Sequence, residues 1–253
     1  MKKLLLALLL TGFGAGIVHS AESANPNEVF SQANQLFEKG EIQRAEEMYL
    51  SLVSQGFESS ELYYNLGNLQ YRKGERGKAV LWYERAARLS PRDADIQFNL
   101  SLAKSHIKDE NTNILRKIVL YITANELGSA VMLLVWIFFG TLGASILGWI
   151  KNETAIGMTL WSSGLVLLLM GAWFGTNVVM SQEPYAIVIN PPGEVRNGPG
   201  TDYAVGFTIP EGSKVIVLNT RPEWTQVGVP SQGLKGWMPN ADIQSIILPS
   251  SSS

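Results

Sequence analysis

The chain has 253 residues, a formal net charge of −2 and 46% hydrophobic residues. Its lysines and arginines form no dense cluster, which excludes the electrostatic footprint of a nucleic-acid-binding protein. Cysteine is absent, so disulfide bonds, thiolate metal sites and a cysteine nucleophile are excluded as well. We therefore expect domains that are stabilised by packing, with no metal and no cofactor.

Residues 1–20 have the pattern of a secretory signal peptide. Lys2 and Lys3 supply the positive start, Leu4–Leu10 the apolar centre, and Val18-His19-Ser20 the cleavage site. An uncleaved anchor is the alternative, because the apolar stretch approaches the lower limit of ~17 residues for a membrane span. In both cases Lys2 and Lys3 stay on the inner, cytoplasmic side of the membrane, so we expect the segment that follows to be exported.

An internal repeat with a period of 34 residues comes next. Shifting the sequence by this period superimposes five pairs of similar residues: Ala33 and Gly67, Lys39 and Lys73, Gly40 and Gly74, Ala45 and Ala79, Tyr49 and Tyr83. A partial third copy follows, since Phe98–Ser101 repeats Tyr64–Gly67. Each unit predicts two helices that are joined by a turn at glycine, which accepts the backbone angles of a helix end.

The segment from Tyr63 to Pro91 resembles a tetratricopeptide repeat (TPR), because Gly67, Ala79 and Tyr83 stand where that family's pattern has them. The resemblance covers residues 26–108. It implies an α-helical solenoid of about two repeats that ends in a capping helix.

The TPR resemblance also implies a concave peptide-binding groove that is lined by the first helix of each unit. The candidate groove residues are Asn34, Phe37, Asn65, Asn68, Tyr71, Arg72 and Asn99. An asparagine carries both a donor and an acceptor and so suits a peptide backbone of any sequence. The alternative is that these asparagines cap turns or face water.

Some TPR relatives clamp a C-terminal carboxylate with two asparagines and three basic residues. Asn34 and Asn65 match the asparagines of that clamp. However, Phe30, Asp95 and Asn99 occupy the places of the basic residues. We therefore do not expect carboxylate specificity in this chain.

Two uncharged runs, residues 127–150 and 154–180, predict transmembrane helices. The first run has 24 residues, which at ~1.5 Å per residue are enough to cross a ~30 Å hydrocarbon core. Only Lys151-Asn152-Glu153 separates the runs, so we expect a two-helix transmembrane hairpin. A buried pair of soluble helices is the alternative, although neither run has a polar face. Without charged residues in the runs, a transport path is not expected.

Small residues recur along both runs at spacings that let helix backbones approach each other in lipid. They are Gly140, Ala144, Gly148, Gly164, Gly171 and Gly175. They predict packing within the hairpin or, alternatively, packing against the spans of a partner. Residues 114–125 have the spacing of an amphipathic juxtamembrane helix, and a plain connector is the alternative there.

Residues 184–248 contain about six short alternating or β-branched runs between glycines and prolines, which predicts a small all-β barrel. The run Val195–Tyr203, followed by Glu211–Val215, Trp224 and Gly236–Met238, resembles a bacterial SH3 domain. The expected fold is therefore multidomain, with a helical solenoid, a membrane hairpin and an SH3-like barrel.

The SH3 resemblance implies an aromatic ligand groove of Tyr203, Trp224 and Trp237, as in relatives that bind cell-wall peptides. The alternative is that the tryptophans belong to the barrel core. Residues 249–253 are expected to form a disordered tail. Because two spans return the chain to the side that it left, we expect both modules on the outer, periplasmic side of a bacterial inner membrane.

A signal peptide, TPRs, a two-span hairpin and a bacterial SH3 domain, in this order, resemble the BatE family, the TPR component of the aerotolerance (Bat) operons. That resemblance implies von Willebrand A-domain membrane proteins and a MoxR-type ATPase as partners. The first hypothesis is a non-enzymatic membrane scaffold that binds proteins or peptides, and the second is a peptidoglycan-binding sensor. A hydrolase is not expected, because His106 is the only histidine after the signal and no serine has a nucleophile-elbow context.

Overall fold

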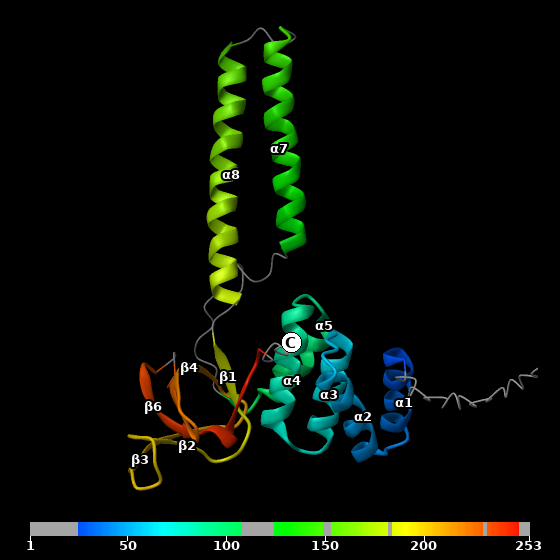
Figure 1. The fold of residues 1–253 in the computed structure, drawn as a ribbon, viewed down its shortest axis with the longest axis vertical. Coiled ribbons are helices and arrows are strands. Elements are labelled where there is room, and N and C mark those ends of the chain that lie inside the picture. The colour runs from blue at the N-terminus through cyan, green and yellow to red at the C-terminus, as the bar shows by residue number, and fades with distance from the viewer. Residues whose placement is uncertain (1–24, 108–123, 149–152, 182–183, 230–231, 248–253) are drawn as a thin grey trace, which may run out of the picture.

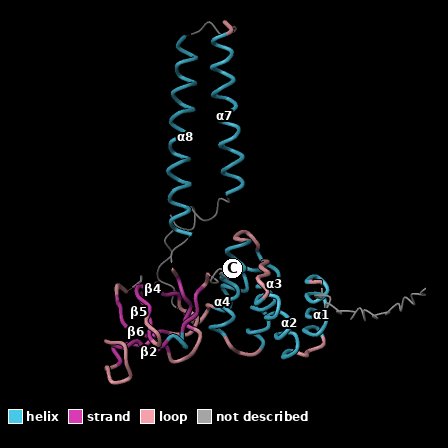
Figure 2. Tube along the Cα trace, in the orientation of Figure 1, coloured by secondary structure: helices cyan, strands magenta, loops and turns pink. Residues whose placement is uncertain are grey.

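The structure, a computed structural model, describes residues 25–107, 124–148, 153–181, 184–229 and 232–247. The predicted signal peptide, most of the juxtamembrane segment 114–125 and the tail 249–253 lie outside the described residues. Figure 2 shows three regions of regular structure: a group of short helices, a β-sheet and a pair of long helices.

The N-terminal region consists of short helices that pack in consecutive pairs. They are α1 (Pro26–Glu38), α2 (Ile42–Ser54), α3 (Ser60–Arg72), α4 (Arg76–Leu89) and α5 (Ala94–Ala103). The side chains of Asn25, Ser59 and Asp93 accept backbone hydrogen bonds at the starts of α1, α3 and α5. Gly40 and Gly74 follow α1 and α3 with a φ of +80°, which glycine adopts without strain. The predicted helical repeats are therefore confirmed.

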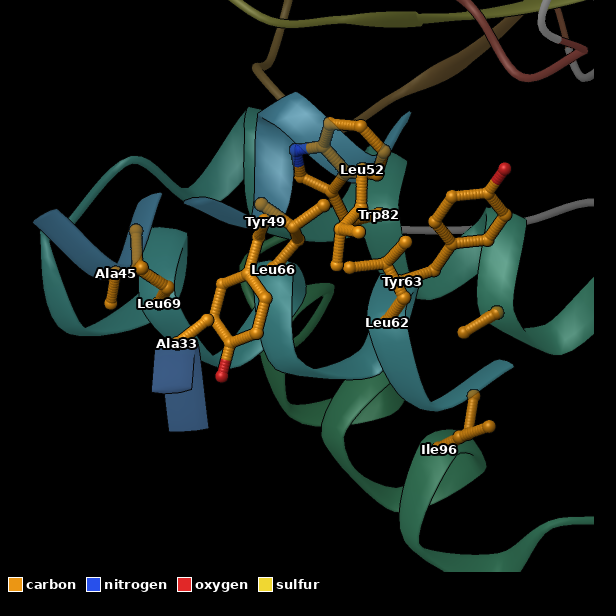
Figure 3. Packing of buried hydrophobic residues seen from close by; sticks show 11 residues of the cluster. Ala33, Ala45, Tyr49, Leu52, Leu62, Tyr63, Leu66, Leu69, Trp82 and Ile96 are labelled. Atoms are coloured by element: carbon orange, nitrogen blue, oxygen red, sulfur yellow. The ribbon is translucent and has the colours of Figure 1, made fainter. Parts of the chain in front are cut away.

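Aromatic rings that pack on small residues hold the repeats together. A Cβ atom on Gly67 would lie 2.5 Å from the ring of Tyr83, so a side chain at this position would push α3 away from α4. Ala33 and Ala45 are fully buried, and Figure 3 shows them in one cluster with Leu66. Gly67 is thus a point of close approach between α3 and α4, and the recurring alanines lie buried between the helices.

The C-terminal region is a seven-stranded antiparallel sheet with the strand order β3-β2-β6-β5-β4-β1-β7. Its strands are β1 (Tyr185–Val188), β2 (Gly193–Arg196), β3 (Val205–Ile209), β4 (Lys214–Thr220), β5 (Trp224–Val229), β6 (Leu234–Pro239) and β7 (Ile243–Ser245). Val188, Val195, Val215 and Met238 are fully buried in its core. The predicted SH3-like module is confirmed, and its sheet has one strand more than the roughly six predicted runs, the short β7.

Two long helices, α7 (Ala124–Ile146) and α8 (Glu153–Ser181), lie side by side. Figure 1 shows them extending away from the repeats and the barrel, which lie together where α7 begins and α8 ends. The 19 residues Gly128–Ile146 are long and apolar enough to cross a membrane, whereas the apolar stretch of α8, Trp161–Gly175, is shorter. Within the described residues, the expectation of two spans is therefore supported for the first helix only.

The predicted stripes of small residues are not the contact between α7 and α8. A Cβ atom would meet no atom within 4 Å at the four glycines inside the helices, Gly140, Gly164, Gly171 and Gly175. Ala144 is partly buried, and Gly148 lies beyond the end of α7 with a φ of +71°. Close packing of these glycines within the pair is thus not observed, and packing against a partner's spans stays a prediction.

The barrel is docked on the repeats through an apolar cluster. Leu81 of α4 and Ala103 of α5 are fully buried in this cluster together with Ile187 of β1. A Cβ atom on Gly77 of α4 would lie 2.7 Å from the carbonyl oxygen of Val188, so the absence of a side chain lets α4 and β1 touch. The barrel thereby covers the apolar end of the repeat stack, which repeat proteins need to shield from water.

A buried carboxylate joins the two regions at the edge of this cluster. Glu84 of α4 accepts hydrogen bonds from Nζ of Lys104, just after α5, and from Nζ of Lys214 on β4, at 2.5 and 2.6 Å. Burial raises the pKa of Glu84, but the charges and hydrogen bonds of the two lysines outweigh it and hold this pKa well below its ordinary value. Glu84 is therefore an anion that both regions help to stabilise.

Arg85, the next residue of α4, holds the edge strand of the barrel. Its Nη2 donates to the carbonyl oxygen of Ser245 at 2.7 Å, and its Nε donates to that of Ile246 at 3.2 Å. The guanidinium carbon lies 4.5 Å from the ring centroid of Trp82. Burial lowers the pKa of Arg85 to about 10, so the side chain stays charged at neutral pH.

We predict that Glu84→Gln weakens the docking of the barrel. The isosteric amide leaves two partly buried lysines without their anion, so we expect the free energy of unfolding to fall by about 2–3 kcal/mol. Chemical denaturation of the full chain in detergent micelles measures this loss. The matched control is Glu61→Gln, at an exposed position of α3, and equal stability of the two variants would contradict the prediction.

Glu84→Gln should also remove the contribution of Glu84 to the pH dependence of the free energy of unfolding. Because the folded-state pKa of Glu84 lies below the ordinary value of 4.5, its stabilising contribution is complete above that pH and is lost as the pH falls below it. Below about pH 4.5 the difference in stability between the natural chain and Glu84→Gln should therefore shrink.

Candidate functional site

A cleft of about 290 Å³ lies on the repeats, between the first helices of successive pairs. It is lined by Phe37, Asn68, Tyr71, Arg72, Tyr83, Asn99 and Leu102. Five of these residues are among the predicted groove residues, so α1, α3 and α5 bring most of the predicted set together. Tyr83 and Leu102 were missed, because Tyr83 belongs to the second helix of a pair and Leu102 resembles a core residue of the capping helix. Asn34 and Asn65 do not line this cleft.

The predicted asparagines form a repeated hydrogen-bond ladder with tyrosines. Oδ1 of Asn34 accepts from the hydroxyl of Tyr49 at 2.6 Å and from Nδ2 of Asn65 at 2.9 Å. This arrangement recurs in the next unit, where Oδ1 of Asn68 accepts from the hydroxyl of Tyr83 at 2.7 Å and from Nδ2 of Asn99 at 3.1 Å. The asparagines therefore neither cap turns nor simply face water; they link one first helix to the next.

The ladder still leaves hydrogen-bonding groups at the cleft. In the described bonds Asn68 uses its Oδ1 and Asn99 uses its Nδ2, which leaves the Nδ2 of Asn68 as a donor and the Oδ1 of Asn99 as an acceptor. Burial, followed by the nearby Tyr64 and Tyr71, raises the pKa of Tyr83, so its hydroxyl stays a neutral donor. A peptide backbone needs this combination of donor and acceptor.

The mouth of the cleft is apolar and carries one cation. The guanidinium carbon of Arg72 lies 4.9 Å from the ring centroid of Phe37, and Nη1 donates to the carbonyl oxygen of Phe37 at 3.4 Å. Tyr71 and Leu102, which also line the cleft, are both exposed. An apolar peptide side chain fits against these groups, and Arg72 suits a carbonyl or carboxylate oxygen.

The three aromatic residues predicted as a groove of the barrel do not form one. Trp237 is buried, with the guanidinium carbon of Arg221 4.8 Å from its ring centroid. Tyr203 packs over Gly198, where a Cβ atom would lie 2.4 Å from the tyrosine ring. Of the three, Trp224 alone lines the cleft that the barrel does have.

That cleft of the barrel has a volume of about 420 Å³. It is lined by Pro191, Pro192, Glu194, Arg196, Thr201, Glu223, Trp224, Pro239 and Asp242. Arg196 is held within it, because Nη2 pairs with Glu194 at 2.8 Å and Nη1 donates to the carbonyl oxygens of Thr201 and Tyr203. The prolines were the signal for this site in the sequence, but they were interpreted only as breaks between strands.

Comparison with known families agrees with both modules. Residues 60–93 match the family model of the tetratricopeptide repeat, and residues 193–244 match that of the bacterial SH3 domain. No match was found among curated proteins or solved structures. Both matched families are binding domains and neither is catalytic, and no relative connects the chain with the Bat operons.

We predict that Asn68→Ala destabilises the repeats. The change removes the acceptor of the buried Tyr83 hydroxyl and of Asn99, which should lower the free energy of unfolding by about 1–2 kcal/mol. Adding Tyr83→Phe removes the stranded donor, so the double variant should lose less than the sum of the two single changes. Thermal or chemical denaturation measures this cycle, and strict additivity would show that the ladder is not a coupled unit.

Proposed function

We propose that the chain is a non-enzymatic membrane-anchored adaptor that binds a peptide segment of a partner protein in the cleft of its repeats. The observation that carries this proposal is the cleft itself. It combines an apolar mouth, one guanidinium and paired amide groups. These groups lie mainly on α1, α3 and α5, the first helices of the units, which line the peptide-binding groove in tetratricopeptide repeat proteins. The match of residues 60–93 to the tetratricopeptide repeat supports the same role.

The long helices are proposed to anchor the chain in a bacterial inner membrane as a two-span hairpin. α7 supports one of the two spans by its apolar length. α8 has 29 residues, which at ~1.5 Å per residue extend over ~43 Å, and it lies alongside α7. We place the repeats and the barrel on the outer, periplasmic side, because Lys2 and Lys3 have the signature of an inner-facing start.

The proposed partners are membrane proteins with von Willebrand A domains, which would act together with a MoxR-type ATPase in a Bat-type envelope complex. The order of the modules along the chain supports this assignment. An anchor raises the effective concentration of a partner that is held in the same membrane, so weak binding in the cleft suffices for stable association.

A second candidate function is binding of cell-wall peptide, or peptidoglycan, by the barrel. The match of residues 193–244 to the bacterial SH3 domain favours it, as does the presence of a cleft on that module. Sedimentation of the full-length protein, solubilised in detergent, with isolated cell wall separates the two functions. Retention by the wall would support the second candidate, and its absence would remove it.

Site-specific photo-crosslinking in membranes tests the adaptor function. A benzophenone amino acid at Tyr71, which lines the cleft and is exposed, should crosslink to an A-domain membrane protein that mass spectrometry identifies. The matched control is the same amino acid at Leu50, an exposed apolar position of α2 outside the cleft.

Arg72→Ala in the labelled chain should reduce the crosslinked product about tenfold, because an interfacial guanidinium commonly contributes more than 1 kcal/mol. Equal labelling from positions 71 and 50, or recovery of lipoproteins and chaperones alone, would contradict the proposed function.

A further inference from the structure

The capping helix α5 is packed between the repeats and the barrel. It has 10 residues, and a helix of this length is only marginally stable in water without tertiary packing. Its buried residues are Ile96, Leu100 and Ala103. Ile96 packs in the core of the repeats, whereas Leu100 and Ala103 lie in the apolar cluster that Ile187 of β1 completes. Two of the three buried residues of α5 therefore lie where the barrel is docked.

The turn between β3 and β4 holds the start of α4 and the end of α5. Oε2 of Glu211 accepts a hydrogen bond from the backbone N–H of Gly77 at 3.1 Å. In the described part of the chain Glu75, the N-cap residue of α4, makes no capping hydrogen bond with its side chain, so the barrel supplies an acceptor that the helix start needs. Nε2 of His106, just after α5, lies 3.2 Å from the carbonyl oxygen of Glu211. One residue of the barrel thus contacts both helices.

Gly212, the next residue of this turn, fits closely against the repeats. It has a φ of +79°, and a Cβ atom there would lie 3.1 Å from Cγ2 of Val80 on α4 and 3.0 Å from Cδ1 of Ile107. Both neighbours are β-branched and therefore stiff. A methyl group at position 212 would push the turn away from α4 and from the end of α5.

α5 forms one wall of the repeat cleft with residues that adjoin these contacts. Asn99 and Leu102 line the cleft, and each precedes one of the two residues that are buried at the barrel. Nδ2 of Asn99 donates to Oδ1 of Asn68 at 3.1 Å and to the hydroxyl of Tyr64 at 2.9 Å. Hydrogen bonds weaken steeply when their geometry changes, so a shift of α5 would disrupt this wall.

We propose that the barrel positions α5 for peptide binding, with Glu211 and Gly212 as positioning residues of the repeat cleft. The docked barrel fixes α5, and α5 completes the cleft. A peptide that contacts α5 in turn favours the docked barrel, because coupling between two binding events is reciprocal. This inference rests on the proposed function, since it assigns a control of that same cleft to the second module.

Double electron–electron resonance within the repeats tests the positioning without any ligand. The chain has no cysteine, so Gln43→Cys on α2 and Ser101→Cys on α5, both exposed, place two spin labels in the full chain in nanodiscs. Gly212→Ala should shift or broaden the distance distribution. The matched control is Gly233→Ala, because Gly233 has a φ of +66° in another turn of the barrel but a Cβ atom there would meet no atom within 4 Å. The control should leave the distribution unchanged.

A second pair of variants removes the contact without straining the backbone. Glu211→Ala deletes the acceptor of the Gly77 N–H and should change the distribution in the same direction as Gly212→Ala. Glu211→Gln keeps an acceptor oxygen and should restore the natural distribution. The melting temperature of each variant verifies its fold, and Glu211→Ala decides the test if Gly212→Ala does not fold.

Photo-crosslinking from the benzophenone amino acid at position 71 gives the functional readout. Gly212→Ala should reduce the crosslinked product about fivefold, a typical size for coupling between sites, and Gly233→Ala should leave it unchanged. If the natural chain gives no product, the proposed function fails while the spin-label distances still test the positioning. Identical distributions in the natural chain, Gly212→Ala and Glu211→Ala would overturn the inference, as would undiminished crosslinking by a variant whose distribution has shifted.

Discussion

The buried carboxylate of Glu84 is the contact on which the arrangement of this protein depends. A carboxylate loses much of its hydration when it is buried, and the loss is offset only if cations and hydrogen bonds replace the water. Here one cation comes from the repeats, at Lys104, and the other from the barrel, at Lys214. Glu84 therefore has both of its cationic partners only when the two regions are docked. Separating the regions would take Lys214 away from Glu84 and would expose the apolar cluster to water.

Docking at this point determines where the two clefts lie. β1 and β7 are the strands that contact α4. The chain runs from the end of β1 to Pro191, and β7 begins directly after Asp242, and both of these residues line the barrel cleft. Arg85 fixes the backbone at the end of β7. α4 also carries Tyr83, whose hydroxyl supports the asparagine ladder of the repeat cleft. One helix thus contacts the supports of both sites, so the repeats and the barrel present their clefts as one body rather than as two tethered domains.

The parts of this fold that could be predicted from the sequence are those that repeat or that follow local rules. Gly67 and Tyr83 belong to a 34-residue pattern, and the turn glycines reveal their backbone angle by their position. The docking could not be predicted, because Glu84 and Arg85 resemble ordinary charged residues of a helix surface, and nothing local shows that β4 and β7 approach them. The barrel cleft was missed for a similar reason: its walls come from three separate segments, whereas the aromatic residues that stood out include the buried Trp237.

The most direct test of the docked arrangement is a distance measurement between the two regions. The chain has no cysteine, so Gln43→Cys on α2 and Asn219→Cys on β4, both exposed, place two unique spin labels. Double electron–electron resonance on the full chain in nanodiscs should give a single narrow distance distribution. A broad distribution, with the fold of each region intact, would contradict the account, because the barrel and the repeats would then move independently.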